Sequence, residues 1–282
     1  MGNCFTCSST DSITYKCALK FPHGGSGIEY NDQTFVKMES IDTWIKECYK
    51  GNKWTGWIAY NDDTSDLGNK HTTKGHCKGI LAWNDTHVSW LIHSVPNFPR
   101  FFTSTTIAPI EKSETMYGQS FCYLVMPNKN NIVNSIMNQI VYMEANMFIK
   151  EKIPSLVELQ PTQKNVLVLQ LSDTITHIAK SPDHQIDIYQ DELVTRHKDM
   201  WYIETWKRGY HYEINPHITD VHSIEYETVN YKSSQDHSKW AACNEHVWIG
   251  DLNRMTTQMN RGGGGVLILN KNLAKLLVSL VK

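Results

Sequence analysis

Two short triplets, His76-Cys77-Lys78 and His237-Ser238-Lys239, lie in opposite halves of this 282-residue chain. Alternate residues of a strand point to the same face, so on strands each His shares a face with its Lys, and the central residue points away. If the two pairs meet, one pocket holds two imidazoles and two ammonium groups. That set suits attack on a phosphodiester, with one His as nucleophile, one as acid and the lysines on phosphate oxygens. The fold must then bring the two halves face to face.

The residues that follow the two triplets form a similar pattern. Each triplet precedes a strand pattern that ends in small or polar residues and an Asn: Asn97 follows His76 by 21 residues, and Asn253 follows His237 by 16. No low-complexity linker or shift in composition separates the halves. The sequence therefore predicts two packed α/β halves, residues 1–130 and 131–282, that form one compact unit.

Hydrophobic spacing predicts the elements of each half. Four Trp residues could stack on bases, but as strand residues they are expected in the core. The run Gly262–Gly265 is expected to form a tight turn before a strand rather than a place where backbone approaches phosphate. In the first half we expect helices at 38–49 and 131–152 and strands at 55–60, 78–83, 87–94 and 121–126. In the second half we expect strands at 166–171, 200–206, 221–229, 247–252 and 266–269, and a closing helix over 273–280. The four Trp residues are Trp54, Trp57, Trp201 and Trp206.

The charge of the chain depends strongly on pH. Net charge is −2 with His neutral and becomes +11 if all 13 His residues are protonated. Below about pH 6 the surface is expected to attract a polyanion. No apolar run reaches the length needed to cross a bilayer, so membrane insertion is not expected.

Cysteine usage does not favour a metal site. Cys4-x-x-Cys7 has no second pair at zinc spacing, and neither a metal nor another cofactor is expected. The N-terminus lacks the pattern of a signal peptide, so the protein either stays in the cell or lost a signal upstream of Met1. Its start also fits the myristoylation pattern Met-Gly-x-x-x-Thr. Asn84 begins a glycosylation sequon that matters only in a secretory context.

Longer strings around the triplets resemble the deoxyribonuclease II family of the phospholipase D superfamily, in family order and over most of the chain. The strings are Tyr60-Asn61-Asp62, Gly75-His76-Cys77-Lys78-Gly79, His93-Ser94-Val95-Pro96-Asn97-Phe98-Pro99, Tyr117-Gly118-Gln119, Asp236-His237-Ser238-Lys239-Trp240, Gly250-Asp251-Leu252-Asn253-Arg254 and Arg261-Gly262-Gly263-Gly264.

The resemblance implies a phospholipase D-like α/β fold with two pseudo-symmetric halves. It implies a lysosomal or secreted acid endonuclease, made with a signal peptide, that cuts double-stranded DNA without metal or sequence preference. The products carry 3′-phosphate and 5′-hydroxyl ends. The catalytic set carried over is His76, Lys78, His237 and Lys239. The supporting or substrate-binding set is His93, Asn97, Asn253 and Arg254.

Several alternatives stay open at this stage. We predict a phosphohistidine on His76 with His237 as acid, although the symmetry allows the reverse. His93 either orients a catalytic group or is a satisfied core His, and Arg254 and Arg261 contact either phosphates or structural carboxylates. The oligomeric state is open, with a homodimer among the options.

Departures from the family pattern concern cysteines. Ala241, Ile249 and Leu267 stand where vertebrate-type members carry Cys, so two usual disulfides are absent. The resemblance implies that Cys122 pairs near the N-terminus, with Cys4 or Cys7. The competing functions are a catalytically inactive, secreted DNA-binding or host-interaction protein and a phospholipase D-like lipid hydrolase. Retention of both His-x-Lys triplets argues against the first, and the Pro-Asn-Phe-Pro and His-Ser-Lys-Trp strings argue against the second.

Overall fold

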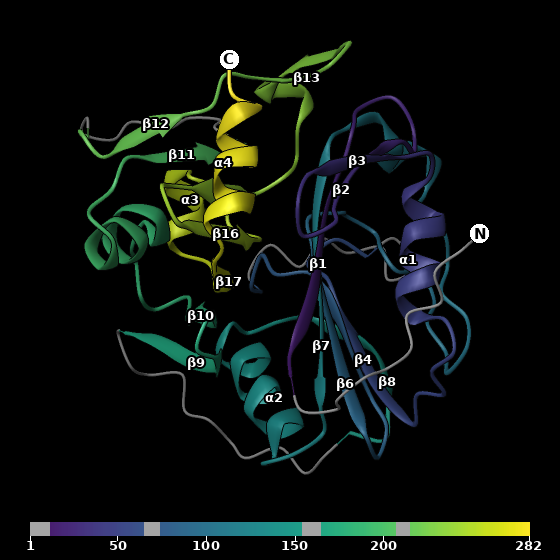
Figure 1. Cartoon of the computed structure of the whole chain (residues 1–282). Coiled ribbons are helices and arrows are strands. Elements are labelled where there is room, and N and C mark those ends of the chain that lie inside the picture. Colours follow the sequence, from purple (N-terminus) through teal and green to yellow (C-terminus); the bar gives the residue numbers. More distant parts are fainter. Residues whose placement is uncertain (1–11, 65–73, 154–164, 207–214) are drawn as a thin grey trace.

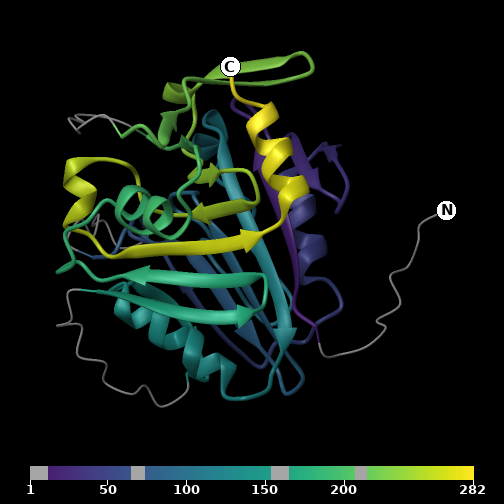
Figure 2. The same cartoon turned by 60° about the vertical axis from the view of Figure 1, so that its left-hand side comes forward.

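Two β-sheets packed face to face form the body of the protein (Figure 1, Figure 2). The computed structural model describes residues 12–64, 74–153, 165–206 and 215–282. The first sheet has the order β3 (Phe35–Met38), β2 (Gly27–Tyr30), β1 (Thr14–Lys20), β7 (Gln119–Pro127), β6 (His87–His93), β5 (Gly79–Trp83), β4 (Gly56–Tyr60) and β8 (Met147–Glu151). The second has the order β12 (Ile218–Asp220), β11 (Trp201–Glu204), β15 (Trp240–Ala242), β16 (His246–Gly250), β17 (Gly263–Leu269), β10 (Ile175–Lys180) and β9 (Val166–Ser172).

Both sheets contain the same run of strands. In the first sheet β1, β7, β6, β5 and β4 are neighbours in that order, and each pair is antiparallel. In the second sheet β10, β17, β16, β15 and β11 repeat the order and every direction. The two His-x-Lys triplets therefore occupy equivalent places, directly before β5 and before β15.

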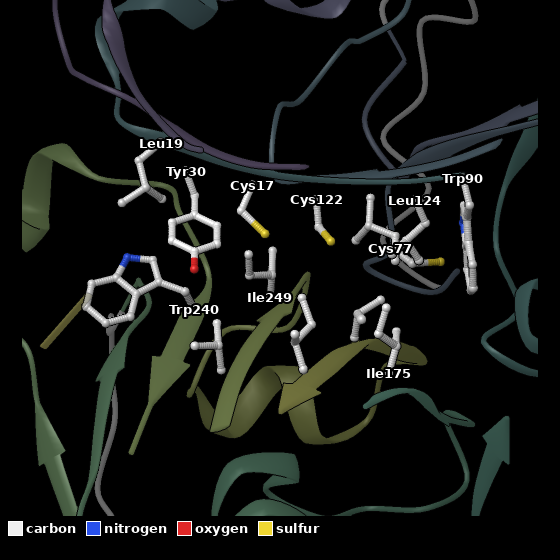
Figure 3. Packing of buried hydrophobic residues seen from close by; sticks show 14 of the residues in the cluster. Cys17, Leu19, Tyr30, Cys77, Trp90, Cys122, Leu124, Ile175, Trp240 and Ile249 are labelled. Carbon is white, nitrogen blue, oxygen red and sulfur yellow. The ribbon is translucent and has the colours of Figure 1, made fainter. Parts of the chain in front are cut away.

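The main hydrophobic core lies between the sheets. Figure 3 shows side chains of the first sheet, among them Cys17, Cys122 and Leu124, pointing toward Ile249 and Ile175 of the second. Helices α2 (Ile132–Tyr142) and α4 (Lys271–Ser279) contribute apolar residues to this layer, and they lie near its opposite ends (Figure 1).

The outer face of each sheet has its own cover. Helix α1 (Ile41–Tyr49) begins after Ser40, whose side chain accepts from the Thr43 N–H, and it packs on the first sheet. The π-helix Ile188–Val194 covers the second sheet. The remaining elements are the hairpin β13 (Ser223–Tyr226) and β14 (Val229–Lys232), the 3₁₀ helices Lys112–Met116 and Ser233–Gln235, and α3 (Thr256–Met259). In the described part of the chain, no helix is long and apolar enough to cross a membrane.

Some predicted elements need correction. The helix expected over 131–152 ends at Tyr142, because Glu144 takes a left-handed backbone and the chain then enters β8. The strand expected over 221–229 is a hairpin whose turn contains Glu227 at φ 52°. Gly263–Gly265 lie within β17 and form no turn.

The remaining predicted elements are confirmed within one to three residues at each end. Trp54 and Trp201 are buried as expected, whereas Trp57 and Trp206 are only half-buried. The boundary between the halves at residue 130 stays a prediction: α2 packs on β9 and β10 of the second sheet, yet the later strand β8 belongs to the first.

Candidate active site

A cavity of about 410 Å³ brings the two triplets together at one place. His76, Lys78, His237 and Lys239 all line it, and Cys77 points instead into the core between the sheets. The expected alternation is present even though the triplets lie just outside the strands. The other lining residues are Asp62, Asp63, Ser94, Pro96, Tyr117, Trp206, Asn253, Met255 and Gln258.

Each His is held by a glycine of the opposite half. The N–H of His76 donates to the carbonyl of Gly262 at 2.8 Å, and the N–H of His237 donates to that of Gly118 at 2.9 Å. These glycines directly precede β17 and β7. A Cβ on Gly262 would lie 2.0 Å from the Met143 carbonyl oxygen, so a side chain would push the backbone away from its partner.

The ring of His76 has a fixed tautomer. Its Nδ1 lies 2.6 Å from the main-chain carbonyl oxygen of Asp251, which can only accept, so Nδ1 carries the proton. In the neutral ring Nε2 then has a free lone pair. Burial, with the nearby Lys78 cation, lowers the pKa of His76 well below its ordinary value and keeps this ring neutral.

An ionised carboxylate, Asp62, lies beside that ring. Lys78 Nζ donates to its Oδ1, Arg261 lies 2.8 Å from its Oδ2, and His76 Nε2 is 4.0 Å from Oδ2. Burial alone would raise the pKa of Asp62, but the surrounding cations outweigh it and hold that pKa below its usual range. Asp62 therefore fixes the directions of Lys78 and Arg261 around the first His.

The second His has aromatic neighbours instead. Tyr117 stacks on His237 with 4.0 Å between ring centroids and 6° between planes, and the ring of Trp206 lies at 69° to that of His237 with 4.4 Å between centroids. Aromatic rings stabilise a cation near their faces, so this environment suits an imidazolium. Asn253 holds the backbone of Trp206, because its Oδ1 accepts from the Trp206 main-chain N–H at 3.2 Å.

The two environments occupy equivalent positions of the repeat. Asp62 and Trp206 each lie two residues after a strand, β4 and β11, and Tyr117 and Arg261 each lie two residues before one, β7 and β17. The first His is thus flanked by an ion pair and the second by two aromatic rings. The two halves therefore share the same backbone arrangement around the His but place different side chains beside it.

Lys239 is buried beside His237. Its N–H donates to Ser120 Oγ at 3.0 Å, and its Nζ donates to the His237 carbonyl. Burial lowers the pKa of Lys239 to about 7, so its ammonium form prevails in acid. Burial also raises the pKa of the Asp251 carboxyl to about 7.

Comparison with known proteins identifies the family. A family model described as Deoxyribonuclease II matches residues 25–282.

The chain belongs to the deoxyribonuclease II family.

Named relatives agree with this membership. The chain is 29% identical over 271 residues to Cell-death-related nuclease 7 of Caenorhabditis elegans, covering 86% of this chain and 72% of the relative. It is 29% identical to Plancitoxin-1 of Acanthaster planci, with 92% and 77% covered, and 30% identical to Deoxyribonuclease-2-beta of Mus musculus, with 77% and 67% covered. The predicted family and the deoxyribonuclease II-like nuclease class are confirmed.

Three residues carried over from the deoxyribonuclease II pattern do not line the cavity. His93 is fully buried, its Nδ1 accepts from the Val95 N–H at 3.2 Å, and burial lowers its pKa to about 3. Asn97, in a left-handed conformation, directs its amide nitrogen toward Glu114 Oε1 at 3.4 Å. His93 is buried as one of its two expected roles requires, but its Nε2 has no hydrogen-bond partner among the described residues, so the choice between the two roles stays a prediction.

Arg254 lies in the protein interior, away from the cavity. It is 4% exposed, its Nε lies 2.9 Å from Asp187 Oδ2, and its Nη1 lies 2.9 Å from Asp220 Oδ1. Of the two expectations for Arg254, these contacts favour the structural ion pair, and a role in DNA binding stays a prediction.

The modification sites stay predictions. Cys122 is a buried free thiol opposite Cys17 on the neighbouring strand, and its expected partners Cys4 and Cys7 lie outside the described residues. Asn84 lies in the turn between β5 and β6, where its Oδ1 accepts from the N–H groups of Thr86 and His87. Within the described ranges, no cluster of His, Cys, Asp and Glu could hold a metal ion.

Sequence reasoning missed the environment of the two His residues. Asp62 and Tyr117 stand in the family strings Tyr60-Asn61-Asp62 and Tyr117-Gly118-Gln119, which could have marked them, but no spacing assigns their contacts. Trp206 was expected in the core, and no local signal distinguishes it from Trp201.

Proposed function

We propose that this chain is an acid endodeoxyribonuclease that hydrolyses double-stranded DNA without a metal ion or sequence preference. The observation that carries the proposal is the meeting of both His-x-Lys pairs at one cavity, one His beside an ion pair and the other between aromatic rings. The relatives named deoxyribonuclease-2 support DNA as the substrate. The repeated strand order supports a phospholipase D-like arrangement of two pseudo-symmetric halves.

In the first step His76 acts as nucleophile. Nε2 attacks phosphorus, the bond from phosphorus to the 5′ oxygen breaks, and the 3′ side of the DNA remains on His76 as a phosphohistidine. His237, as imidazolium, gives its proton to the departing 5′ oxygen. The fixed Nδ1–H of His76 supports this assignment, because it leaves Nε2 as the unprotonated nitrogen.

In the second step His237, now neutral, takes a proton from water. The resulting hydroxide attacks phosphorus, the phosphorus–nitrogen bond breaks, and Nε2 recovers its electron pair. The product ends are a 3′-phosphate and a 5′-hydroxyl. His237 is protonated again and ready for the next cycle.

Lys78 and Lys239 neutralise the charge that develops on the phosphate oxygens. Asp62 holds Lys78 in place, and acid supplies the proton on Lys239, whose pKa is about 7. His residues at the surface add positive charge in acid, which favours DNA binding, whereas His93 and His177 are buried and do not contribute. An acidic compartment or secretion, as expected for lysosomal or secreted family members, fits this dependence.

Plasmid nicking at about pH 5 with a chelator tests the proposal. Wild-type protein should convert supercoiled plasmid to nicked circles, and His237→Ala should lose this activity. End-group analysis should find 3′-phosphates. Purified wild type that nicks nothing would support the inactive DNA-binding alternative, and nicking stopped by chelator would overturn the metal-free mechanism.

A further inference from the structure

Two buried lysines outside the cavity end equivalent strands of the repeat. Lys20 is the last residue of β1 and Lys180 the last of β10, and both are 0% exposed. Each belongs to a Lys-x-Pro sequence, Lys20-Phe21-Pro22 and Lys180-Ser181-Pro182. A buried ammonium group is costly unless its protons are accepted, so its acceptors show what it organises.

The ammonium group of Lys20 holds the approach to β7. Its Nζ donates to the carbonyls of Phe21 at 2.7 Å, Gly24 at 3.1 Å and Thr115 at 3.0 Å. Thr115 lies two residues before Tyr117, whose ring stacks on His237. Lys20 of the first sheet is therefore linked, through a short segment, to the His of the second.

The ammonium group of Lys180 holds the approach to β17. Its Nζ donates to the carbonyls of His184 at 3.0 Å, Met259 at 2.8 Å and Arg261 at 2.6 Å, with Ser181 at 3.4 Å. The Arg261 guanidinium pairs with Asp62, and the next carbonyl, that of Gly262, accepts from the His76 N–H. Lys180 of the second sheet is linked in the same way to the His of the first.

The acceptors of both groups are main-chain carbonyls, and burial lowers the pKa of each lysine to about 8. Both lysines are therefore protonated in acid, and each ammonium group donates to three or more carbonyls. A neutral side chain of the same length would leave those carbonyls unsatisfied, and the segments before β7 and β17 would relax.

We propose that Lys20 and Lys180 are reciprocal positioning residues, each of which fixes the segment that orients the catalytic His of the opposite half. This inference rests on the proposed function: Lys20 serves the general acid His237, and Lys180 serves the nucleophile His76. Neither lysine lines the cavity, so each acts only through the strand approach that it holds.

Two substrates separate these roles. Plasmid DNA needs a proton on its 5′ oxygen, whereas thymidine 3′-(p-nitrophenyl phosphate) loses p-nitrophenolate without one. Lys20→Met should lower the plasmid rate by about tenfold or more and leave the first-turnover burst of p-nitrophenolate within about threefold of wild type. Lys180→Met should lower both by about tenfold or more. His237→Ala and His76→Ala are the reference variants for the two patterns.

Lys16→Met, an exposed change on the same strand as Lys20, is the control and should match wild type on both substrates. The ratio of the two rates does not depend on the fraction of protein that is folded, so a merely structural role for Lys20 would leave it unchanged. Lys20→Gln, which keeps an N–H donor, should restore part of the plasmid rate, and it replaces Lys20→Met if that variant does not fold.

Equal losses on both substrates for Lys20→Met, or wild-type rates for both lysine variants, would overturn the inference. Metal-free nicking by wild type in the same assay reports on the proposed function separately. The two ideas can therefore fail independently.

Discussion

The Nδ1 atom of His76 lies 2.6 Å from the main-chain carbonyl oxygen of Asp251, across the boundary between the two sheets. This contact decides which ring nitrogen is free, because a carbonyl oxygen accepts and never donates. His76 therefore presents Nε2 as a lone pair, and its pKa, well below the ordinary value, keeps it so in acid. This asymmetry supports the proposed assignment of His76 as nucleophile and His237 as acid.

Asp62→Asn tests the ion pair beside His76. The variant removes the carboxylate that holds Lys78 and Arg261, and we expect kcat/KM to fall about a hundredfold and the melting temperature to drop. The Asp62 charge raises the pKa of His76 against burial, so its loss should move the acid-side midpoint of kcat/KM to lower pH. Asp85→Asn, in an exposed turn, is the control. An unchanged rate with an unchanged pH profile would show that Asp62 has no part in the site.

The high-pH side of the activity should reflect Lys239. A lysine with a pKa of about 7 is charged below that pH and neutral above it, so kcat/KM should fall as pH rises through 7. Lys239→Arg keeps a charge at every pH and should extend activity upward, while Lys239→Met should lose about a hundredfold or more. The measurement is kcat/KM on plasmid DNA from pH 4 to 9. A wild-type profile that is flat through pH 7 would refute the role of this group.

Trp206→Leu tests the aromatic neighbours of His237. A cation–π contact of about 1 kcal/mol is lost, so the plasmid rate should fall about fivefold. The p-nitrophenolate burst should not change, because that leaving group needs no acid. Trp57→Leu removes an equally half-buried Trp that packs against Phe102 and serves as the matched control. A parallel loss on both substrates would mean that Trp206 only supports the fold.

Arg254→Met distinguishes an ion pair from a phosphate contact. Breaking its buried pairs with Asp187 and Asp220 should cost about 3–5 kcal/mol of unfolding free energy. The slope of log kcat/KM against log salt should stay as in wild type, whereas Lys78→Met should reduce that slope by about one. If Arg254→Met flattens the salt dependence without loss of stability, the arginine contacts DNA after all.

Much of the site could be predicted from sequence, because His-x-Lys before a strand is a local pattern and its duplication implies a meeting point. Strands β5, β6 and β7 could also be predicted, since each is a short apolar run between turn residues. The side chains that contact the two His residues could not be predicted. Tyr117 and Gly118 contact His237 from 120 residues away, and no periodicity in either segment records that distance.

The contacts of Arg254 also could not be predicted from local sequence. Its position beside Asn253 allows either a phosphate contact or a structural ion pair, and which of the two forms depends on where the π-helix Ile188–Val194 and the preceding Asp187 pack. Local sequence does not specify that packing. Strand β8 was missed for a related reason: the apolar spacing of 143–151 suits a helix, and pairing with β4 overrides it.

His76 is proposed to form the covalent bond to phosphorus. The direct measurement uses His237→Ala with thymidine 3′-(p-nitrophenyl phosphate), because this variant keeps the nucleophile and lacks the base for the second step. After a quench into alkali, peptide mass spectrometry should find thymidine 3′-phosphate attached to His76 at close to one equivalent. His76→Ala should carry no adduct. An adduct on His237 in the His76→Ala protein, with His76 unmodified in the His237→Ala protein, would show that His237 is the nucleophile.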